Sequence, residues 1–485
     1  MIPEFSSPEW VHHAVFYQIF PDRFASSPRV EKPGNLEPWD SKPNSYGFKG
    51  GDLLGVCERL DYLQDLGVNA IYFTPIFQSA ANHRYHTHDY WKVDPLLGGD
   101  PAFHQLFDEA HRRGMHVILD GVFNHASRGF FQFHHILENG ASSPYIDWFR
   151  VNGFPLNAYD GKPNYDAWLD LPALPEFNHA NPQVRRFIFD VARYWIEQGA
   201  DGWRLDVPFW IEDPTFWQEF RQAVKGANAD AYITGEIPMD ASPWLQGDMF
   251  DGVMNYMLSY ACWGFFGGED FDPKSIGGWM DHAEGLLPND APGFGRQVGD
   301  LLRRYPQPAV LAQLNLLDSH DSPRFLTLMR GDKARQRLAV LFQMTYPGAP
   351  CVYYGDEIGM EGGEDPDNRR AFPWDEGRWD EELRGYYQRC IALRKAHRAL
   401  RDGEFAPLLA EGGVFAYLRS WEQEKAVIVL NRTPSRFDRP LETGDRLSDG
   451  SVLEDQLGAG GGRVARGRFE GISVPPMSGA VYLQR

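Results

Sequence analysis

Short apolar segments alternate with longer amphipathic segments along the first 400 residues of the chain. The apolar segments are rich in β-branched and aromatic residues, which is typical of buried strands, and the segments between them have the period of helices. Eight candidate strands occupy residues 14–20, 69–74, 116–122, 201–207, 231–237, 250–256, 311–317 and 351–357. Strands that alternate with helices favour a parallel sheet, and eight are enough to close a TIM (β/α)8 barrel. The pattern therefore predicts an α/β protein built on such a barrel.

Two regions depart from this alternation. About eighty residues separate the third and fourth strands, far more than one crossover helix requires, and residues 126–180 are rich in Phe, Pro, Asn and Trp with little periodicity. From residue 401 the pattern changes to short alternating strands such as VFAYLRS and KAVIVLN, which are typical of an antiparallel sheet. We therefore expect a catalytic barrel over 1–125 and 181–400, an inserted lobe over 126–180, and a C-terminal antiparallel β-sandwich domain over 401–485.

Composition narrows the classes of partner. The formal charge is -20 and no cluster of Lys and Arg offsets it, which excludes nucleic acid and anionic membranes as expected partners. The N-terminal stretch MIPEFSSPEW lacks the basic and apolar regions of a signal peptide, and no apolar run is long enough to cross a bilayer, so we expect a cytoplasmic protein. The cysteines, Cys57, Cys262, Cys351 and Cys390, are widely spread and are expected to be free buried thiols.

Polar residues crowd the carboxyl ends of the candidate strands, where barrel active sites are built. The third strand is followed by Asp120, Asn124 and His125, the fourth carries Arg204 and Asp206, the fifth carries Glu236, and the seventh is followed by His320 and Asp321. For any one acid, capping a helix or pairing with a base is an equally good interpretation. Several acids at successive strand ends of one barrel favour catalysis instead.

The positions of these acids indicate that they have different chemical roles. Arg204 and Asp206 are two residues apart on one strand, so both side chains should point into the barrel mouth. A neighbouring guanidinium should lower the pKa of Asp206 and keep it ionised, as a nucleophile requires. Glu236 would share a water-poor cleft with Asp206 and Asp321, which favours the protonated form that a general acid requires. Two carboxyl groups in these roles are the machinery of glycoside hydrolysis.

Four segments, DGVFNH (120–125), GWRLDV (202–207), GEI (235–237) and DSHD (318–321), resemble in order and spacing the signature segments of the α-amylase family of glycoside hydrolases. LPEFN (174–178) resembles the family's additional segment. The resemblance implies that Asp206 is the nucleophile, Glu236 the acid/base, and Asp321 the acid that grips substrate hydroxyls. It also implies that His125, Arg204 and His320 contact the scissile glucose, and that Asp120 is a structural partner of Arg204.

Within that family, YFTPIFQSAANHRYHTHDYW, LLDSHDSPR and PCVYYGDEIGMEGG resemble segments of neopullulanases, cyclomaltodextrinases and maltogenic amylases. This resemblance implies that Tyr90 stacks on the sugar at the cleavage point and that Asp365 and Arg369 bind glucose units on the non-reducing side. Asp365 and Arg369 could equally form a surface ion pair. The implied activity is retaining hydrolysis of α-1,4 and possibly α-1,6 bonds in maltooligosaccharides, cyclodextrins, pullulan or starch, with some transglycosylation, so the expected partner is an α-glucan oligosaccharide.

The chain departs from that subgroup in several places. The subgroup usually carries an extra β-domain before the barrel, around which it dimerises, whereas here VFYQIFPDRF begins the barrel almost at once. DVPFW replaces the usual DVANE, and Ile237 and Pro238 follow Glu236, where the subgroup often has a Trp. An oligo-1,6-glucosidase, a trehalose-forming transferase and a plain α-amylase on the same fold therefore remain alternatives. A non-catalytic carbohydrate-binding barrel is disfavoured because all three acids are present.

A metal is the one cofactor that the resemblance raises. The subgroup often binds calcium through an Asn- and Asp-rich loop after the first strand, ending at a Gly-Gly-Asp. Here Gly50, Gly51 and Asp52 remain, but the loop reads ASSPRVEKPGN and lacks most of the oxygen ligands that a hard cation needs. We therefore expect that no metal or other cofactor is required. The sequence leaves the preferred glucan and the oligomeric state open.

Overall fold

Eight parallel strands close into a barrel in the computed structural model, which describes residues 5–283, 288–458 and 460–484. Their order around the barrel, β1-β10-β9-β8-β7-β6-β5-β2, follows their order in the chain, as in a TIM barrel. The strands are β1 (Phe16–Ile19), β2 (Ala70–Phe73), β5 (His116–Gly121), β6 (Gly202–Leu205), β7 (Tyr232–Glu236), β8 (Gly252–Met254), β9 (Leu314–Leu316) and β10 (Ala349–Tyr353). The predicted fold class is confirmed.

Every predicted barrel strand overlaps an observed one, and the largest difference in position is at the last. Residues 351–357 were expected to form this strand, whereas β10 begins at Ala349 and ends at Tyr353. The chain leaves the sheet because Gly355 has a φ of 89°, and Asp356–Ile358 then form a 3₁₀ turn. A positive φ suits glycine and ends the extended backbone.

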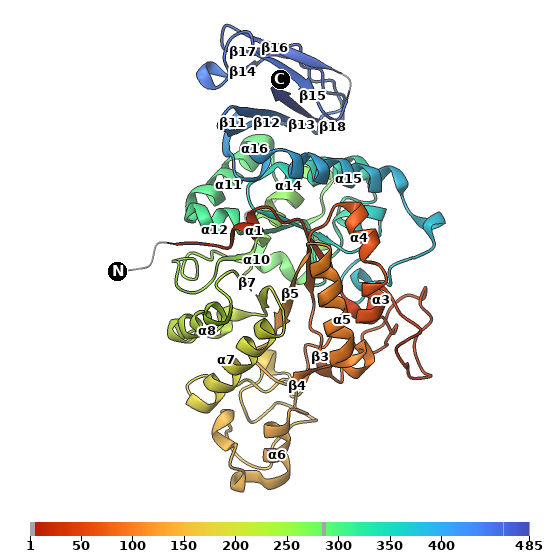
Figure 1. Ribbon diagram of the computed structural model, residues 1–485, viewed down its shortest axis with the longest axis vertical. Coiled ribbons are helices and arrows are strands. Elements are labelled where there is room, and N and C mark those ends of the chain that lie inside the picture. The colour runs from red at the N-terminus through yellow and green to blue at the C-terminus, as the bar shows by residue number, and fades with distance from the viewer. Residues whose placement is uncertain (1–4, 284–287, 459, 485) are drawn as a thin grey trace.

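Amphipathic helices surround the barrel (Figure 1). In α7 (Pro182–Glu197), Asn181 caps the first turn by accepting a hydrogen bond from the Gln183 amide, and Pro182 occupies the first helical position, both favourable at a helix start. The other helices are α1 (Glu9–His12), α2 (Pro21–Phe24), α3 (Leu53–Cys57), α4 (Leu60–Leu66), α5 (Gly99–Arg112), α8 (Pro214–Ala227), α9 (Tyr256–Gly267), α10 (Met280–Ala283), α11 (Ala291–Arg304), α12 (Gln307–Leu311), α13 (Phe325–Leu328), α14 (Lys333–Thr345), α15 (Glu381–Ala396) and α16 (Arg398–Arg401).

Between β5 and α7 the chain forms a lobe at one end of the molecule, which contains α6 (Phe131–Asn139) and short 3₁₀ turns (Figure 1). Its interior is aromatic, with the rings of Phe133, Phe149 and Tyr165 in contact. A two-stranded ribbon that the sequence pattern did not predict, β3 (Phe77–Ser79) and β4 (Thr87–Val93), is joined to the lobe by a hydrogen bond from the Ser127 amide to the Thr87 carbonyl.

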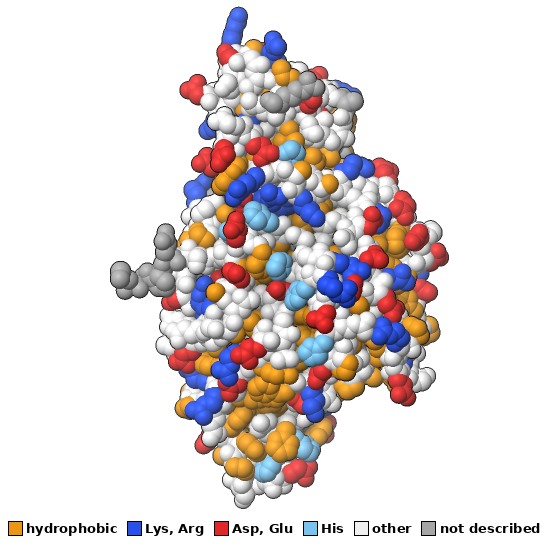
Figure 2. All heavy atoms as spheres, viewed as in Figure 1, with side chains coloured by type: hydrophobic (Ala, Val, Ile, Leu, Met, Phe, Trp, Pro, Cys, Tyr) orange, Lys and Arg blue, Asp and Glu red, His pale blue; other side chains and the backbone are white. Residues whose placement is uncertain are grey.

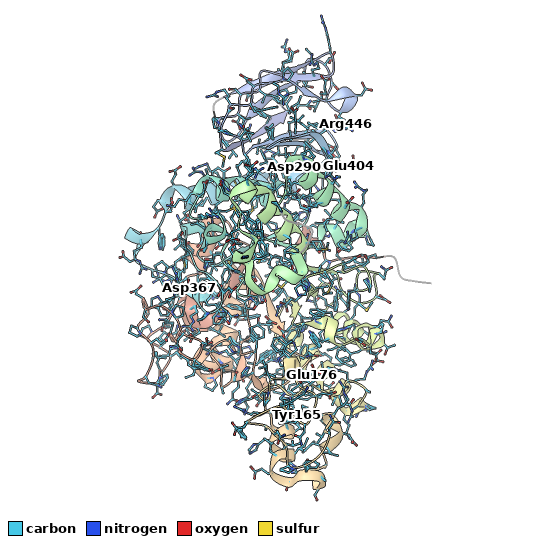
Figure 3. All side chains as sticks on the ribbon, turned by 180° about the vertical axis from the view of Figure 1, so that it is seen from behind. Tyr165, Glu176, Asp290, Asp367, Glu404 and Arg446 are labelled. Atoms are coloured by element: carbon cyan, nitrogen blue, oxygen red, sulfur yellow. The ribbon has the colours of Figure 1, made fainter. Side chains whose placement is uncertain are left out.

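The C-terminal region is an antiparallel sheet whose two faces pack against different partners. One face of β12 and β13 contributes Phe415, Tyr417 and Ile428 to the core shared with the barrel, and the other face encloses a second core. In Figure 3 Glu404 and Arg446 lie in this domain, at the opposite end of the molecule from Tyr165 and Glu176 of the lobe. Its strands are β11 (Glu404–Glu411), β12 (Val414–Trp421), β13 (Glu424–Asn431), β14 (Leu441–Glu442), β15 (Val452–Asp455), β16 (Gly461–Ala465), β17 (Arg468–Glu470) and β18 (Ser478–Gln484).

The surface carries interspersed acidic and basic side chains on the face drawn in Figure 2. Across the described part of the chain, no helix is both long and apolar enough to span a bilayer. The four cysteines are free thiols; Cys262, Cys351 and Cys390 are buried as expected, whereas Cys57 is half-buried.

The resemblance suggested a calcium site in the loop between β1 and α3. In the structure the ammonium groups of Lys32 and Lys49 lie in this loop. Both carboxylate oxygens of Asp52 are engaged, one by the Gly55 amide at 2.7 Å and the other by the Ser27 amide at 2.8 Å and Lys32 Nζ at 2.9 Å. The buried Lys49 Nζ donates to the carbonyl oxygens of Pro38 and Ser41, at 2.7 Å each.

Within the described ranges no group of His, Cys, Asp or Glu side chains could hold a metal ion. The ammonium groups of Lys32 and Lys49 already contact the oxygens of this loop and would repel a divalent cation. The residues therefore do not fit calcium.

From this loop we predict that dialysis against a chelator leaves activity and melting temperature unchanged. Lys49→Ala should instead lower the melting temperature, because it leaves buried carbonyl oxygens unsatisfied at a cost of roughly 1–3 kcal/mol each. Thermal unfolding and kcat/KM, measured with and without chelator, provide the check. A loss of either that added calcium restores would contradict the prediction.

Candidate active site

The barrel brings the predicted acids to one end of the sheet. Asp120 in β5 is the register partner of Arg204 in β6, Asp206 follows β6 directly, and Glu236 is the last residue of β7. Asp321 lies in the loop after β9. Since all of these strands are parallel, their carboxyl ends share one rim, and the four carboxyl groups converge there.

One guanidinium lies at the centre of these acids. Arg204 is fully buried, and its Nη1 lies 2.9 Å from both carboxylate oxygens of Asp120 and 3.0 Å from Asp206 Oδ1. Its Nη2 lies 2.8 Å from Glu236 Oε2 and 3.9 Å from Asp321 Oδ2. Asp206 and Glu236 thus contact the two terminal nitrogens of the same side chain, which holds both carboxyl groups at one point of the rim.

The electrostatics of the acids differ from the expectation for Asp206. Burial raises the pKa of Asp206 well above its ordinary value, and this effect outweighs the opposing charge of Arg204. Burial, with the negative charge of Glu236, also raises the pKa of Asp321 to about 7. One arginine does not balance several buried carboxylates, so Asp206 and Asp321 are both harder to ionise than a free aspartate. Arg204 does act to lower the pKa of Asp206, as predicted, but burial raises it by more, so the prediction of a lowered net pKa was wrong.

Asp120 is held by three donors. Besides Arg204, the hydroxyl groups of Tyr72 and Tyr85 each donate to its Oδ2 at 2.9 Å. Asp120 is almost completely buried, and these contacts are those of a structural partner of Arg204. Tyr85 also hydrogen-bonds His320, so it links this partner to the loop after β9.

The two histidines present neutral rings. Gln18 Nε2 lies 2.7 Å from His320 Nδ1, so the amide donates there and the ring proton resides on Nε2, which lies 3.1 Å from Asp321 Oδ2. His125 stacks on Trp168 with ring centroids 5.3 Å apart, and burial lowers the pKa of His125 to about 3. Its Nε2 is buried and finds no hydrogen-bond partner among the described residues, which leaves it available to a sugar hydroxyl.

The structure corrects the expected role of Tyr90. It was expected to stack on the sugar, but it is 0% exposed and its hydroxyl donates to the carbonyl oxygens of Val122 and His125 at 2.9 Å. It therefore anchors β4 beneath the lobe and cannot present a face to substrate. The aromatic residues that line the cavity with the acids are Tyr85 and Trp168. Tyr85 lies in the same sequence segment as Tyr90, and only the packing of this segment in the fold distinguishes the two.

Asp365 and Arg369 do form an ion pair, with Nη1 and Oδ1 3.2 Å apart. Arg369 is nevertheless mostly buried: its Nε donates to the His320 carbonyl at 2.8 Å and its Nη2 lies 3.3 Å from Asp321 Oδ1. Both members of the pair also line the cavity of the acids. An ion pair and a place in the wall of the cavity are therefore compatible for Asp365 and Arg369.

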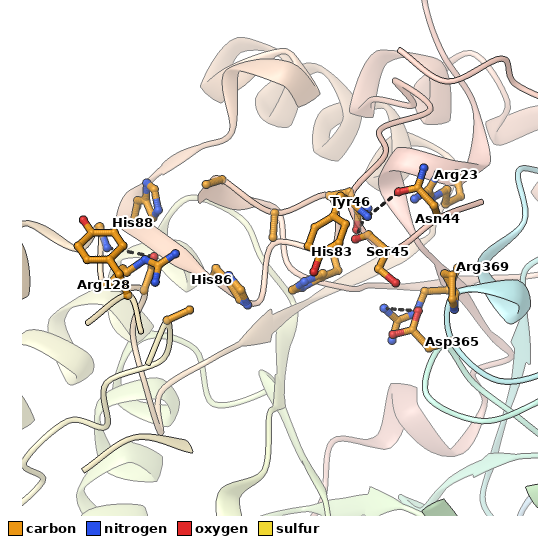
Figure 4. Close-up of a pocket in the computed structure, with 18 of the residues that line it drawn as sticks. Arg23, Asn44, Ser45, Tyr46, His83, His86, His88, Arg128, Asp365 and Arg369 are labelled. Atoms are coloured by element: carbon orange, nitrogen blue, oxygen red, sulfur yellow. Dashed lines mark hydrogen bonds and ion pairs between the residues drawn. The ribbon is translucent and has the colours of Figure 1, made fainter. Parts of the chain in front are cut away.

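Two cavities meet at this ion pair. The first, of about 440 Å³, contains Asp206, Glu236 and Asp321 together with His125, Trp168 and Leu171. The second, of about 510 Å³, shares His83, His86, Asp365 and Arg369 with the first. Figure 4 shows Tyr46 near the Asp365–Arg369 end of the second cavity, and His88 and Arg128 at its far end.

The second cavity also has aromatic residues at its rim. Tyr46 is 90% exposed and Tyr159 is 68% exposed, and both line it. Concave surfaces that combine exposed aromatic rings with a few fixed polar groups are suited to ligands such as sugars. The two cavities adjoin along the residues that line both.

Comparison with known proteins agrees with this geometry. The family description "Alpha amylase, catalytic domain" matches residues 18–403. A cyclomaltodextrinase from a Bacillus species is 45% identical over 88% of this chain and 74% of its own length, and neopullulanase 2 of Thermoactinomyces vulgaris is 45% identical over 88% and 70%. The crystal structure of a debranching enzyme from Nostoc punctiforme superposes with a TM-score of 0.89 at 44% identity, covering 99% of each chain. With its acids arranged around one arginine at the rim of the barrel, the chain belongs to the α-amylase family of glycosidases.

Proposed function

We propose that this protein is a retaining α-glucan hydrolase in which Asp206 is the nucleophile and Glu236 the general acid/base. The observation that carries the proposal is the shared contact with Arg204, which holds the two carboxyl groups on adjacent nitrogens of one guanidinium. A retaining mechanism needs its two carboxyl groups close together, about 5–5.5 Å apart, whereas an inverting one leaves room for a water between them.

The reaction would proceed in two displacements. In the first, a carboxylate oxygen of Asp206 forms a bond to the anomeric carbon while the glycosidic C–O bond breaks and the leaving oxygen takes a proton from Glu236. In the second, Glu236 takes a proton from water, whose oxygen attacks the anomeric carbon and releases Asp206. A sugar hydroxyl in place of that water would give transglycosylation.

The surrounding residues support these roles. Asp321 receives contacts from His320 and Arg369 and faces the same cavity, so its oxygens can bind the hydroxyls of the glucose that is cleaved. His125 and Asp365 line that cavity and would bind the same or the next glucose. The polar side chains in this cavity would fix the ring orientation, and Trp168 and Leu171 would contact its apolar faces.

The cleft and the relatives favour maltooligosaccharides, cyclodextrins and pullulan as substrates, with cleavage of α-1,4 and some α-1,6 bonds. Proteins named cyclomaltodextrinase and neopullulanase are 45% identical to this chain. The second cavity continues beyond Asp365 and Arg369, so several glucose units can bind at once. A cytoplasmic location, where imported oligomers are the available glucans, is part of this proposal.

Substitution of the two acids should separate their roles. Asp206→Ala should lower kcat by at least about 10⁴-fold for every substrate, because no covalent intermediate forms. Glu236→Gln should lower kcat/KM for maltotriose by about 10²–10⁴-fold but affect 4-nitrophenyl α-maltoside far less, since nitrophenolate needs little protonation to leave. Glu212→Gln, at an exposed acid in the segment between β6 and α8, serves as the control. Activity of Asp206→Ala close to that of the wild type would refute the assignment.

The anomeric form of the product tests the two-step mechanism. Each displacement inverts the anomeric carbon, so an α-linked substrate should release an α-anomeric sugar. Proton NMR during the first minutes of maltotriose hydrolysis distinguishes the anomers before mutarotation mixes them. If the β-anomer appears first, water attacks directly and Asp206 is not a nucleophile.

Substrate preference distinguishes the proposed activity from the activities of other enzymes with the same fold. We expect faster cleavage of cyclodextrin and short maltooligosaccharides than of starch. Incubation with cyclodextrin, pullulan, starch, isomaltose and trehalose, followed by chromatography of the products, measures the order. Starch as the best substrate would identify a plain α-amylase, and activity mainly on isomaltose would identify an oligo-1,6-glucosidase.

A further inference from the structure

The backbone turns abruptly straight after the proposed nucleophile. The Asp206 amide donates to the Gly121 carbonyl at 3.1 Å and so continues the contact between β5 and β6. The next residue, Val207, has a φ of 35° and a ψ of 49°, in the left-handed region, and the 3₁₀ turn Pro208–Trp210 begins directly after it.

This conformation is unfavourable for Val207 on two counts. A β-branched residue with positive φ is a true outlier, and the ring of a following proline restricts the preceding residue to extended backbone. Strain of this kind, about 1–3 kcal/mol, persists only where surrounding contacts impose it, and such residues concentrate at functional sites. The strained residue here lines the cavity and is 9% exposed.

The turn directs the Val207 amide toward Glu236, the proposed acid/base. The Val207 amide donates to Glu236 Oε2 at 3.1 Å, and Arg204 Nη2 lies 2.8 Å from the same oxygen. An oxygen that accepts an amide hydrogen bond and also lies beside a guanidinium charge is a poor site for a proton. When Glu236 is protonated, its proton is therefore directed to Oε1.

Pro208 holds the turn against the strand that carries Glu236. A Cβ added to Gly235 would lie 2.8 Å from the Phe250 ring and 3.2 Å from Pro208 Cγ. The proline ring thus lies close to the backbone of Gly235, the residue immediately before Glu236. Residues 206–208 and 235–236 therefore contact each other both through the Val207 amide and through this packing.

We propose that Val207 is a positioning residue: its left-handed backbone, held by Pro208, directs an amide to Glu236 Oε2 and so reserves Oε1 for proton transfer. In the first step the Oε1–H bond breaks and an O–H bond forms on the leaving oxygen, which keeps the electron pair of the broken glycosidic bond. In the second step water returns a proton to Oε1. The inference rests on the proposed role of Glu236.

A single-atom change in the backbone tests the hydrogen bond. Replacement of Val207 by its α-hydroxy acid converts the amide N–H into an ester oxygen and keeps the side chain. We expect kcat/KM for maltotriose to fall about tenfold, the lower range for a hydrogen bond to a charged group. The value for 4-nitrophenyl α-maltoside should change less than about twofold, because protonation contributes little there. The basic limb of the pH profile should also move.

The matched control is the same ester at Phe209, in the same turn, whose amide donates to no side chain among the described residues and whose replacement should leave both substrates unaffected. An equal loss on both substrates at Val207 would show that the amide supports the fold and not proton transfer, and no loss would overturn the proposal. Failure of Glu236→Gln to spare the nitrophenyl substrate would instead refute the role of Glu236, so the two ideas fail separately.

A second pair of variants tests the backbone conformation without relying on the ester. Val207→Ala removes both γ-methyl groups and Val207→Gly removes Cβ as well, but only glycine adopts a positive φ without strain. The melting temperature of Val207→Gly should therefore exceed that of Val207→Ala, the reverse of the usual order. A more stable alanine variant would show that the left-handed turn is absent, which overturns the proposal.

Discussion

The buried guanidinium of Arg204 is the interaction on which the site depends. Its Nη1 contacts Asp120 and Asp206, and its Nη2 contacts Glu236. Taking this many charges out of water costs several kcal/mol per ion, and an incomplete set would be strongly destabilising. The cluster is stable because each member has several partners. Burial still raises the pKa of Asp206 and of Asp321, so these two acids are harder to ionise than a free aspartate.

Supports around the arginine come from elements far apart in the chain. Tyr72 in β2 and Tyr85 before β4 hold Asp120, and Gln18 in β1 orients His320. Tyr90 fastens β4 to the carbonyl oxygens of Val122 and His125. The ribbon and the lobe therefore act as a frame that fixes the side chains on the rim, and Trp168 of the lobe completes one wall of the cavity.

The loops of the rim contain the segments that departed in sequence from the subgroup that the chain resembles. Strand ends supply the acids, whereas loops shape the cleft in a barrel enzyme. Here the loop after β6 contains the Val207–Pro208 turn, and the loop after β1 uses Lys32 and Lys49 to satisfy buried oxygens. The barrel can carry such loops because its hydrogen-bonded sheet does not depend on them.

The sequence by itself determined the barrel and the positions of the acids within it. Hydrophobic segments of strand length are a local signal, and a residue at the end of a parallel strand must lie on the rim, so the amino-acid pattern alone assigns Asp206, Glu236 and Asp321 to that rim. Which aromatic residue faces the cavity could not be decided in this way. Tyr85 and Tyr90 are five residues apart in one segment, and packing of the ribbon against the lobe buries one and leaves the other beside His320. The raised pKa of Asp206 and the left-handed turn at Val207 likewise arise from burial and from contacts between distant strands. Only tertiary structure decides these, because desolvation and packing depend on every neighbour in space, whereas sequence pattern reports only neighbours along the chain.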